Sequence, residues 1–306
     1  MIKARVAVLL STYNGEEYIG ELLESLFFQY FKNFTLFVRD DCSSDNTLSI
    51  IDQYKDNLDI KLIHSDENLG AANSFFSLLD VAGNDFDYYA FADQDDVWLP
   101  EKIDRAVNKL DLIPSDNALL YCTRLEYVDK NLIHLSWSRV PNNIGFGNAL
   151  VENIATGCTV VINNAARKLT LSKLPQNCLM HDWWLYLVIS CYGTVYWDDY
   201  SGIKYRQHGS NVVGAATTIL GDIQRRVDRF LRDDKNGLFR LSDQAAAFFS
   251  LFCSDLPIEK LVILCSILRG KTSFFERLKL ASSFSIWRQR PFDNVLMRLM
   301  ILINRY

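Results

Sequence analysis

Within Tyr88-Tyr89-Ala90-Phe91-Ala92-Asp93-Gln94-Asp95-Asp96, an apolar run passes directly into three carboxylates. The apolar half predicts a buried strand, which places the acidic half at the carboxyl end of that strand. Carboxylates this close repel one another, so a positive partner is expected beside them. Mg²⁺ or Mn²⁺ suits such hard oxygen ligands and is commonly held by carboxylates together with substrate phosphates. The stretch therefore indicates chemistry on a phosphorylated substrate such as a nucleotide.

Predicted strands and helices alternate through the first 110 residues. Apolar runs predict strands at residues 6–11, 34–38, 60–63 and 88–91, and helical spacing predicts helices at 16–28, 45–54, 71–79 and 98–110. This alternation is typical of an α/β fold in which helices cover both faces of a mostly parallel, Rossmann-like sheet. Ligands of such sheets bind at the carboxyl ends of the strands, where Thr12-Tyr13-Asn14, Asp40-Asp41 and the acidic stretch are expected to meet.

The pattern changes along the second half of the chain. Strands are expected at residues 118–123, 194–197 and 203–205, and a helix is expected at 180–192. From about residue 214 onward the pattern is helical, with breaks at Pro257 and Pro291. We therefore predict an α/β catalytic domain at residues 1–212 and a helical C-terminal region at residues 213–306.

Composition excludes several classes of protein. The formal net charge of −5 gives no general reason to expect nucleic-acid binding. The seven cysteines are odd in number and contain no C-x-x-C, which favours free thiols in a reducing cytoplasm over disulfides or a zinc site. No apolar stretch approaches the roughly 18 residues that a membrane span needs, and the first residues are too short for a signal peptide. A cytoplasmic protein is expected, with peripheral attachment to the inner face of the cell membrane as a further option.

Phosphate binding through a glycine-rich loop is not predicted. No G-x-G-x-x-G follows the first strand, and no G-x-x-x-x-G-K-[ST] occurs in the chain. Phosphates would then be neutralised by a metal ion, for which Asp93-x-Asp95 supplies the carboxylates.

Four motifs occur in a recognisable order. They are Val8-Leu9-Leu10-Ser11-Thr12-Tyr13-Asn14-Gly15, Arg39-Asp40-Asp41-Cys42-Ser43-Ser44-Asp45, Glu67-Asn68-Leu69-Gly70 and Asp93-Gln94-Asp95-Asp96-Val97-Trp98. Together they resemble the motifs of family-2 glycosyltransferases over about residues 4–212. The resemblance implies a GT-A fold and an inverting, metal-dependent transfer from a nucleotide-sugar. Two later segments, His181-Asp182-Trp183-Trp184 and 205–211, are similar to those of rhamnosyltransferase-like members that build bacterial surface polysaccharides.

The resemblance implies a role for each residue on the donor side. Asp95 would bind the metal ion that bridges the donor's diphosphate, and Asp93 would contact the ribose or share the metal. Asp41 would accept a hydrogen bond from the imide N–H of uracil or thymine, while Thr12 and Tyr13 would line the base and ribose. Each of these residues has a structural alternative in a turn or a helix entry.

On the acceptor side, Asp182 is the candidate base. Inverting transfer is a single in-line displacement, so one carboxylate must take the proton of the attacking hydroxyl. Trp183 and Trp184 would desolvate this carboxylate and raise its basicity, or would simply belong to the helix core. His208 would reach the metal or the diphosphate, and Arg206 would pair with phosphate. Metal, and no second carboxylate, would stabilise the departing diphosphate.

Structural interpretations also exist for Asp96, Asp40 and Asp182. Asp96 stands just before the predicted helix at 98–110. A role in capping that helix is predicted as readily as a role in the acidic site. Asp40 would be the structural partner of Asp41. Asp182 also has a structural alternative, the N-cap of the helix that follows it.

The C-terminal segment is basic. From Arg269 to Tyr306 the chain carries eight Lys or Arg against two Asp or Glu, interleaved with aromatic residues. Basic amphipathic helices of this kind suit an anionic membrane surface. An ordinary helical cap or an interface between two copies of the chain is the alternative.

These observations give one leading hypothesis and three alternatives. The leading one is transfer of a sugar, best matched by L-rhamnose from dTDP-L-rhamnose, to a saccharide or lipid-linked saccharide acceptor during cell-surface polysaccharide synthesis. A UDP-hexose transferase using galactose, glucose or N-acetylglucosamine remains open. A nucleotidyltransferase is disfavoured because residues 11–17, which follow the first strand, are neutral to acidic. A noncatalytic nucleotide-sugar-binding scaffold is disfavoured because Asp95 and Asp182 are both present.

Overall fold

The computed structural model describes residues 4–114, 116–207 and 240–306, and these residues form two compact units. The first unit comprises Met1–Val140, Ala155–Ser172 and Met180–His208. The second comprises Pro141–Ile154, Lys173–Leu179 and Gly209–Tyr306, so two short segments of the α/β sequence join the C-terminal helices. The boundary predicted at residue 212 lies outside the described residues.

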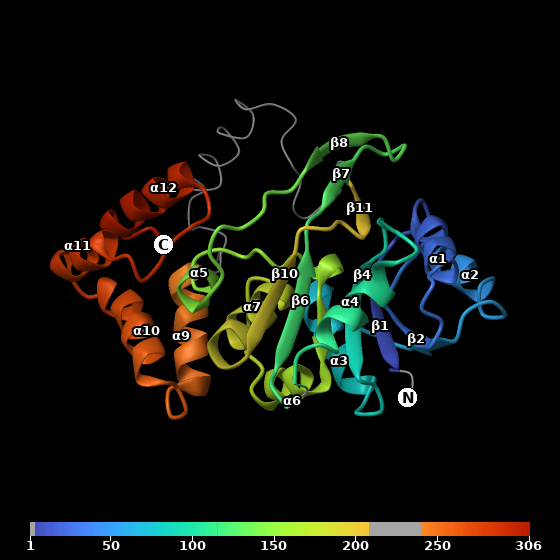
Figure 1. The fold of residues 1–306 in the computed structure, drawn as a ribbon, viewed down its shortest axis with the longest axis horizontal. Helices are drawn as coiled ribbons and strands as arrows, with labels where there is room; N and C mark the ends of the chain where they lie inside the picture. The colour runs from blue at the N-terminus through green and yellow to red at the C-terminus, as the bar shows by residue number, and fades with distance from the viewer. Residues whose placement is uncertain (1–3, 115, 208–239) are drawn as a thin grey trace. The chain divides into compact units, whose positions relative to one another are not determined.

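A seven-stranded sheet forms the centre of the first unit (Figure 1). Its strands are β1 (Val6–Thr12), β2 (Phe34–Asp40), β3 (Ile60–Ile63), β4 (Tyr88–Asp93), β6 (Leu119–Thr123), β9 (Val161–Asn163) and β10 (Thr194–Asp198), in the order β10-β6-β9-β4-β1-β2-β3. All neighbours are parallel except β9, which is antiparallel to both β4 and β6. The predicted mostly parallel sheet is confirmed, and β1 lies between the two strands that end in the acidic motifs.

A second sheet of four strands belongs to the same unit. Its order is β5 (Val97–Trp98), β11 (Ile203–Arg206), β7 (Glu126–Val128) and β8 (His134–Trp137). β11 runs parallel to β7, and the two outer pairs are antiparallel. The acidic stretch lies in the chain between β4 of the large sheet and β5 of the small one, so both sheets position it.

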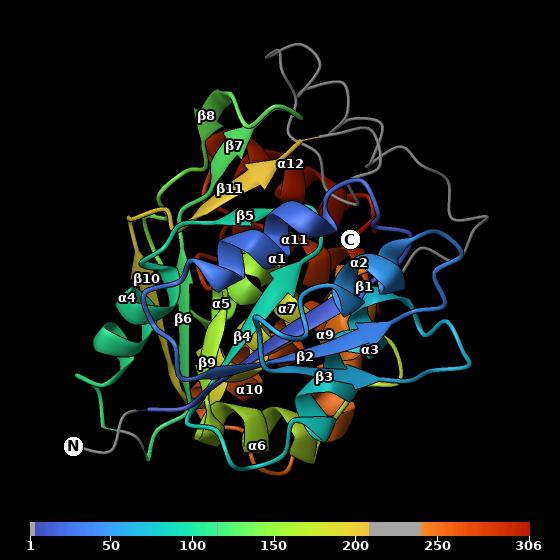
Figure 2. The ribbon, with the colours of Figure 1, turned by 90° about the vertical axis from the view of Figure 1, so that its right-hand side faces the viewer.

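Helices cover both faces of the large sheet, as the sequence predicts. One face carries α1 (Ile19–Phe27), α2 (Thr47–Asp52) and α4 (Lys102–Leu110), and the other carries α3 (Gly70–Val81), α6 (Asn164–Ser172) and α7 (His181–Tyr192). Successive side chains of a strand point to opposite faces. Val6, Val8 and Leu10 therefore pack with the apolar residues of α1 and α4, and Figure 2 shows α1 lying along this face.

The helix predicted at 98–110 begins later than the sequence suggests. Val97 and Trp98 form the short strand β5, and α4 starts at Lys102. Trp98 pairs with Ile203 of β11, and its N–H donates to Ser25 Oγ at 3.1 Å. Pro100 also keeps Leu99 out of the helix, because a proline disfavours helical conformation at the residue before it.

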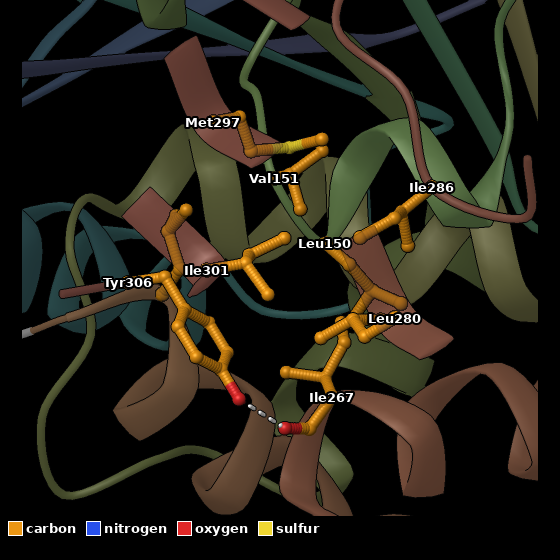
Figure 3. Close-up of a pocket in the computed structure, with 9 residues that line it drawn as sticks. Leu150, Val151, Ile267, Leu280, Ile286, Met297, Ile301 and Tyr306 are labelled. Atoms are coloured by element: carbon orange, nitrogen blue, oxygen red, sulfur yellow. Dashed lines mark hydrogen bonds between the residues drawn. The ribbon is translucent and has the colours of Figure 1, made fainter. Parts of the chain in front are cut away.

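The second unit is helical. It contains α5 (Phe146–Ala149), α9 (Leu241–Phe252), α10 (Ile258–Gly270), α11 (Phe274–Ser282) and α12 (Pro291–Leu302). Pro257 and Pro291 precede or begin helices, as predicted. Figure 3 shows the apolar side chains that these elements turn toward one another, with Tyr306 donating its hydroxyl hydrogen bond to the Ile267 carbonyl at 2.8 Å. In the part of the chain that the structure describes, no helix is both long and apolar enough to cross a bilayer.

Candidate active site

The ends of β1 and β4 are joined by one glutamine. The Tyr13 N–H donates to Gln94 Oε1 at 2.9 Å, and Gln94 Nε2 donates back to the Tyr13 carbonyl at 3.0 Å. A Cβ on Gly15 would lie 2.4 Å from Gln94 Oε1, so the close approach requires glycine there. Tyr13 leaves more than half of its surface exposed, at 52%. Its predicted stacking role is therefore sterically open, and Gln94 is a positioning residue that the sequence did not reveal.

The end of β2 provides a second set of polar groups. Thr12 is buried and donates from Oγ1 to Asp40 Oδ1 at 2.9 Å. The Ser43 N–H donates to the other oxygen of Asp40 at 2.8 Å. Asp40 thus fixes the turn after β2 through Thr12 and Ser43, and its predicted role as the structural partner of Asp41 stays a prediction. The predicted contact of Thr12 with base or ribose stays a prediction.

Asp41 fastens the Glu67–Gly70 motif to the end of β2. The N–H groups of Leu69 and Gly70 donate to its two oxygens, each at 2.8 Å, and Arg39 forms an ion pair with it. Burial would raise the pKa of Asp41, but Arg39 and the two backbone donors outweigh burial and lower the pKa. Asp41 is therefore a buried carboxylate at the start of α3, and its role toward a pyrimidine stays a prediction.

The acidic stretch carries two of the predicted site residues. Asp93 and Asp95 are half-buried at the end of β4. Burial, followed by the nearby negative charges of Asp95 and Asp182, raises the pKa of Asp93 to about 7. Asp182 belongs to α7, far from Asp93 along the chain, and its negative charge adds to that of Asp95 in raising the pKa of Asp93. This concentration of negative charge fits a divalent cation.

A buried cluster lies behind these carboxylates. One ligand atom each from Asp93, Asp96 and Cys158 lie within 4.8 Å of one another. Lys102 is buried beside them with its Nζ 3.3 Å from the centre of the Trp98 ring, and burial lowers its pKa to about 7. Burial also raises the pKa of the Cys158 thiol, which keeps it protonated. A soft thiol and a neighbouring amine suit Mg²⁺ or Mn²⁺ poorly, so the half-buried Asp93 and Asp95 fit the ion better.

The predicted cap function of Asp96 is wrong. Asp96 stands before β5 and not before a helix, and it accepts a hydrogen bond from the Arg206 N–H at 3.1 Å. Its other oxygen has no hydrogen-bond partner among the described residues. Asp96 therefore joins the acidic stretch to β11.

Asp182 lies in the first turn of α7, where two backbone groups orient its carboxylate. The Gly157 N–H donates to Oδ2 at 2.8 Å, and the Trp183 N–H donates to Oδ1 at 2.6 Å. Met180 occupies the N-cap position, so Asp182 is not the helix cap. Trp184 is fully buried in the core while Trp183 is half-buried, so only Trp183 keeps the position expected of an apolar wall. The role of Asp182 as base stays a prediction.

His181, the residue before it, is a buried neutral imidazole. Its ring lies against Phe75, with 4.0 Å between ring centres, and also contacts Phe91. Neither ring nitrogen has a hydrogen-bond partner among the described residues. Burial lowers the pKa of His181 to about 3, so the ring stays uncharged at neutral pH.

Arg206 does not have the position predicted for a phosphate ligand. Its guanidinium is buried and donates to the Asp95 carbonyl at 2.9 Å, to Glu21 Oε2 at 2.8 Å and to the Lys130 carbonyl. It also lies 4.5 Å from the centre of the Tyr18 ring. The guanidinium therefore donates its hydrogen bonds to groups of the protein itself, and one of these bonds holds the backbone of the acidic stretch. Nothing near Arg206 in the sequence signals these partners. His208, the other predicted ligand, lies outside the described residues.

The family follows from comparison with known proteins. The model of "Glycosyl transferase family 2" matches residues 7–168, just over half of the chain. The chain belongs to glycosyltransferase family 2. This confirms the resemblance given by the four motifs.

Individual relatives agree with the family. The chain is 32% identical over 221 residues to dTDP-rhamnosyl transferase RfbG of Shigella flexneri, covering 67% of this chain and 74% of that protein. It is 29% identical over 157 residues to UDP-Glc:alpha-D-GlcNAc-diphosphoundecaprenol beta-1,3-glucosyltransferase WfgD of Escherichia coli, covering 51% and 59% of the two chains.

A solved structure shows the fold. Residues 1–349 of TarS from S. aureus, in complex with UDP-GlcNAc, match 99% of this chain and 89% of their own with a TM-score of 0.57 at 18% identity. The predicted GT-A fold followed by a C-terminal helical part is confirmed for this family-2 glycosyltransferase.

Proposed function

We propose that this family-2 glycosyltransferase transfers a sugar from a pyrimidine nucleotide-sugar to a saccharide acceptor, with inversion at the anomeric carbon. One observation carries the proposal. Asp182 accepts a hydrogen bond from the Gly157 N–H at 2.8 Å, and the next residue, Cys158, has its ligand atom within 4.8 Å of one from Asp93. This supports one shared site for the candidate metal ligands and the candidate base, which are 87 residues apart in the chain when counted from Asp95 to Asp182.

The donor would bind across the ends of β1, β2 and β4. Asp95, with Asp93, would hold Mn²⁺ or Mg²⁺, and a bound ion would neutralise the charge of the departing diphosphate. His208 is proposed as a further ligand of the ion. The exposed ring of Tyr13 would stack on the base, while Thr12 and Asp41 would shape the end of the base pocket.

Asp182 would take the proton of the acceptor hydroxyl as that oxygen attacks. The two N–H groups on its carboxylate fix the direction of the remaining lone pairs. A positioned base of this kind contributes roughly 10²–10⁴ to the rate.

The donor proposed first is dTDP-L-rhamnose, and the Shigella relative named as a dTDP-rhamnosyl transferase supports it. A UDP-hexose is the second candidate, supported by the UDP-Glc named for the E. coli relative and by the UDP-GlcNAc complex of TarS. The diphosphoundecaprenol in the E. coli relative's name supports a lipid-linked acceptor. The product would then enter a cell-surface polysaccharide.

Calorimetric binding tests the proposal. The protein is titrated with dTDP, UDP, GDP and ADP, first with Mn²⁺ and then with EDTA. Binding of dTDP or UDP that requires Mn²⁺ is expected, and the tighter of the two selects the donor series for a transfer assay. Equal affinities with Mn²⁺ and EDTA would remove the metal role. Metal-dependent binding of GDP or ADP alone would overturn the pyrimidine assignment.

A further inference from the structure

The outward side of α12 is apolar along its whole length. Phe292, Val295, Leu299 and Ile303 follow one another at spacings of three, four and four residues, and each is more than half exposed. This spacing places them along one side of a helix. The inward side is a different set, including Met297, Met300 and Ile301, and these three are buried. Figure 3 shows Met297 and Ile301 facing the apolar interior of the second unit. α12 is therefore apolar on both sides, although only one side has a protein partner among the described residues.

Neighbouring elements add further exposed apolar side chains. Phe274, Phe275 and Leu278 of α11 are exposed, and Phe284, in the connection between α11 and α12, is exposed by 91%. Arg298 of α12 holds this connection by donating to the Ser283 carbonyl at 2.8 Å, and its guanidinium lies 5.8 Å from the centre of the Phe284 ring. We call these eight exposed residues of α11, α12 and their surroundings the apolar face: Phe274, Phe275, Leu278, Phe284, Phe292, Val295, Leu299 and Ile303.

Within residues 261–306 the exposed charges have one sign, whereas Asp243, Asp255 and Glu259, earlier in the second unit, are exposed acids. Among residues 261–306, the charged residues with exposed side chains are Arg269, Lys279 and Arg305. The acidic residues of this segment are withdrawn from solvent, because Asp293 is buried and Glu276 is half-buried and accepts a hydrogen bond from Lys279 at 2.7 Å. The stretch from Arg269 to Tyr306 carries a net charge of +6, from eight basic and two acidic residues.

We propose that the apolar face inserts into the surface of an anionic lipid bilayer. At the boundary between headgroups and acyl chains, the apolar side chains would lose their contact with water. The basic side chains beside them would meet the negative charge of the headgroups. A second copy of the chain fits less well, since a two-fold interface would set the same positive surface against itself. The inference does not depend on which sugar the site transfers.

Vesicle co-sedimentation of the full chain tests this inference. The vesicles are either pure phosphatidylcholine or phosphatidylcholine mixed with phosphatidylglycerol. We expect binding to the anionic vesicles that is about tenfold tighter than to the neutral ones and that weakens as salt is raised. The double substitution Val295→Glu with Leu299→Glu should weaken binding by about tenfold or more. Lys279→Glu should weaken binding to anionic vesicles alone, by about fivefold or more.

The control is Leu112→Glu, which places a carboxylate on an exposed leucine of the first unit. This variant should bind vesicles as the unchanged protein does, and melting temperatures should show that all variants fold. Three outcomes would overturn the inference: no vesicle binding, equal binding to both kinds of vesicle, or equal loss in the control. A dimer in sedimentation velocity that the Val295→Glu, Leu299→Glu variant abolishes would assign the apolar face to a second copy of the chain.

Discussion

Arg206 Nε donates to the backbone carbonyl of Asp95 at 2.9 Å, across 111 positions of sequence. The same guanidinium pairs with Glu21 of α1, and the Arg206 N–H donates to Asp96. Arg206 thus holds the acidic stretch by two bonds, one from its guanidinium to the Asp95 backbone and one from its own backbone N–H to the Asp96 carboxylate. These contacts of Arg206 help to position the backbone of Asp95.

Arg206→Lys should loosen the acidic stretch without removing its carboxylates. A lysine cannot reproduce the planar set of donors that reaches three acceptors at once. We expect metal-dependent affinity for dTDP or UDP to fall by about tenfold, together with a loss of about 2 kcal/mol in unfolding free energy. Calorimetry with Mn²⁺ and urea denaturation measure the two effects.

Arg105→Lys is the matched control for this substitution. Arg105 makes a two-bond pair with Asp198, at 2.7 and 3.0 Å, that does not involve the acidic stretch. It should lose stability while keeping nucleotide affinity. If both variants lose nucleotide affinity equally, the loss comes from general destabilisation, and the proposal that Arg206 positions the acidic stretch is refuted.

Asp182→Asn should stop transfer while donor binding remains. The amide keeps the volume of the carboxylate and can still accept from the Gly157 N–H, but it cannot take a proton. The transfer rate should drop by roughly 10²–10⁴, with donor affinity within about twofold of the original. A transfer assay and calorimetry on the same sample separate the two effects. Loss of donor affinity would show that the residue is structural.

Asp95→Ala should remove the metal dependence of donor binding. In Mn²⁺ the variant should bind UDP or dTDP only as weakly as the unchanged protein does in EDTA, because the ion loses a charged ligand. In EDTA the two proteins should bind alike. Unchanged affinity in Mn²⁺ would contradict the metal role of Asp95.

His181→Phe should make folding stability less sensitive to acid. The folded-state pKa of about 3 lies below the ordinary value near 6.5, so the unfolded chain binds more protons between these limits. Stability is therefore fully present above about pH 6.5 and is lost as the pH falls toward 3, by up to about 1.4 kcal/mol per pH unit. Phenylalanine has no such proton and fits beside Phe75 and Phe91.

Urea denaturation between about pH 4 and pH 6.5 measures this slope. The exposed His64 provides the control, because His64→Gln removes a histidine without disturbing the core. The His181→Phe slope should be shallower than that of both the control and the unchanged protein. Equal slopes in all three would show that His181 takes up its proton without unfolding.

The local parts of this structure were accessible from sequence. β4 follows from its apolar run, and Pro257 and Pro291 mark helix starts because proline lacks the N–H that a helix interior needs. The resemblance to the family also predicted that Asp93, Asp95 and Asp182 belong to one site, and this stays a prediction. These features depend on neighbours in the chain or on the direction of parallel strands.

The parts that sequence missed depend on distant partners. The Gly157 N–H that orients Asp182 is 25 residues away, and the partners of Arg206 range from Glu21 to Lys130. β9 pairs antiparallel in the sheet, and nothing in the sequence of its three residues predicts that direction. No local periodicity encodes such pairings, since they arise only when the sheets have assembled.

The pair of hydrogen bonds between the Gln94 side chain and the Tyr13 backbone has a thermodynamic consequence. It makes the segment proposed to receive the base continuous with the segment proposed to hold the cation. When a ligand orders one of these two segments, the other segment has less conformational entropy left to lose on binding its own ligand. Because such linkage is reciprocal, the nucleotide should tighten the cation by the same factor by which the cation tightens the nucleotide, whichever arrives first.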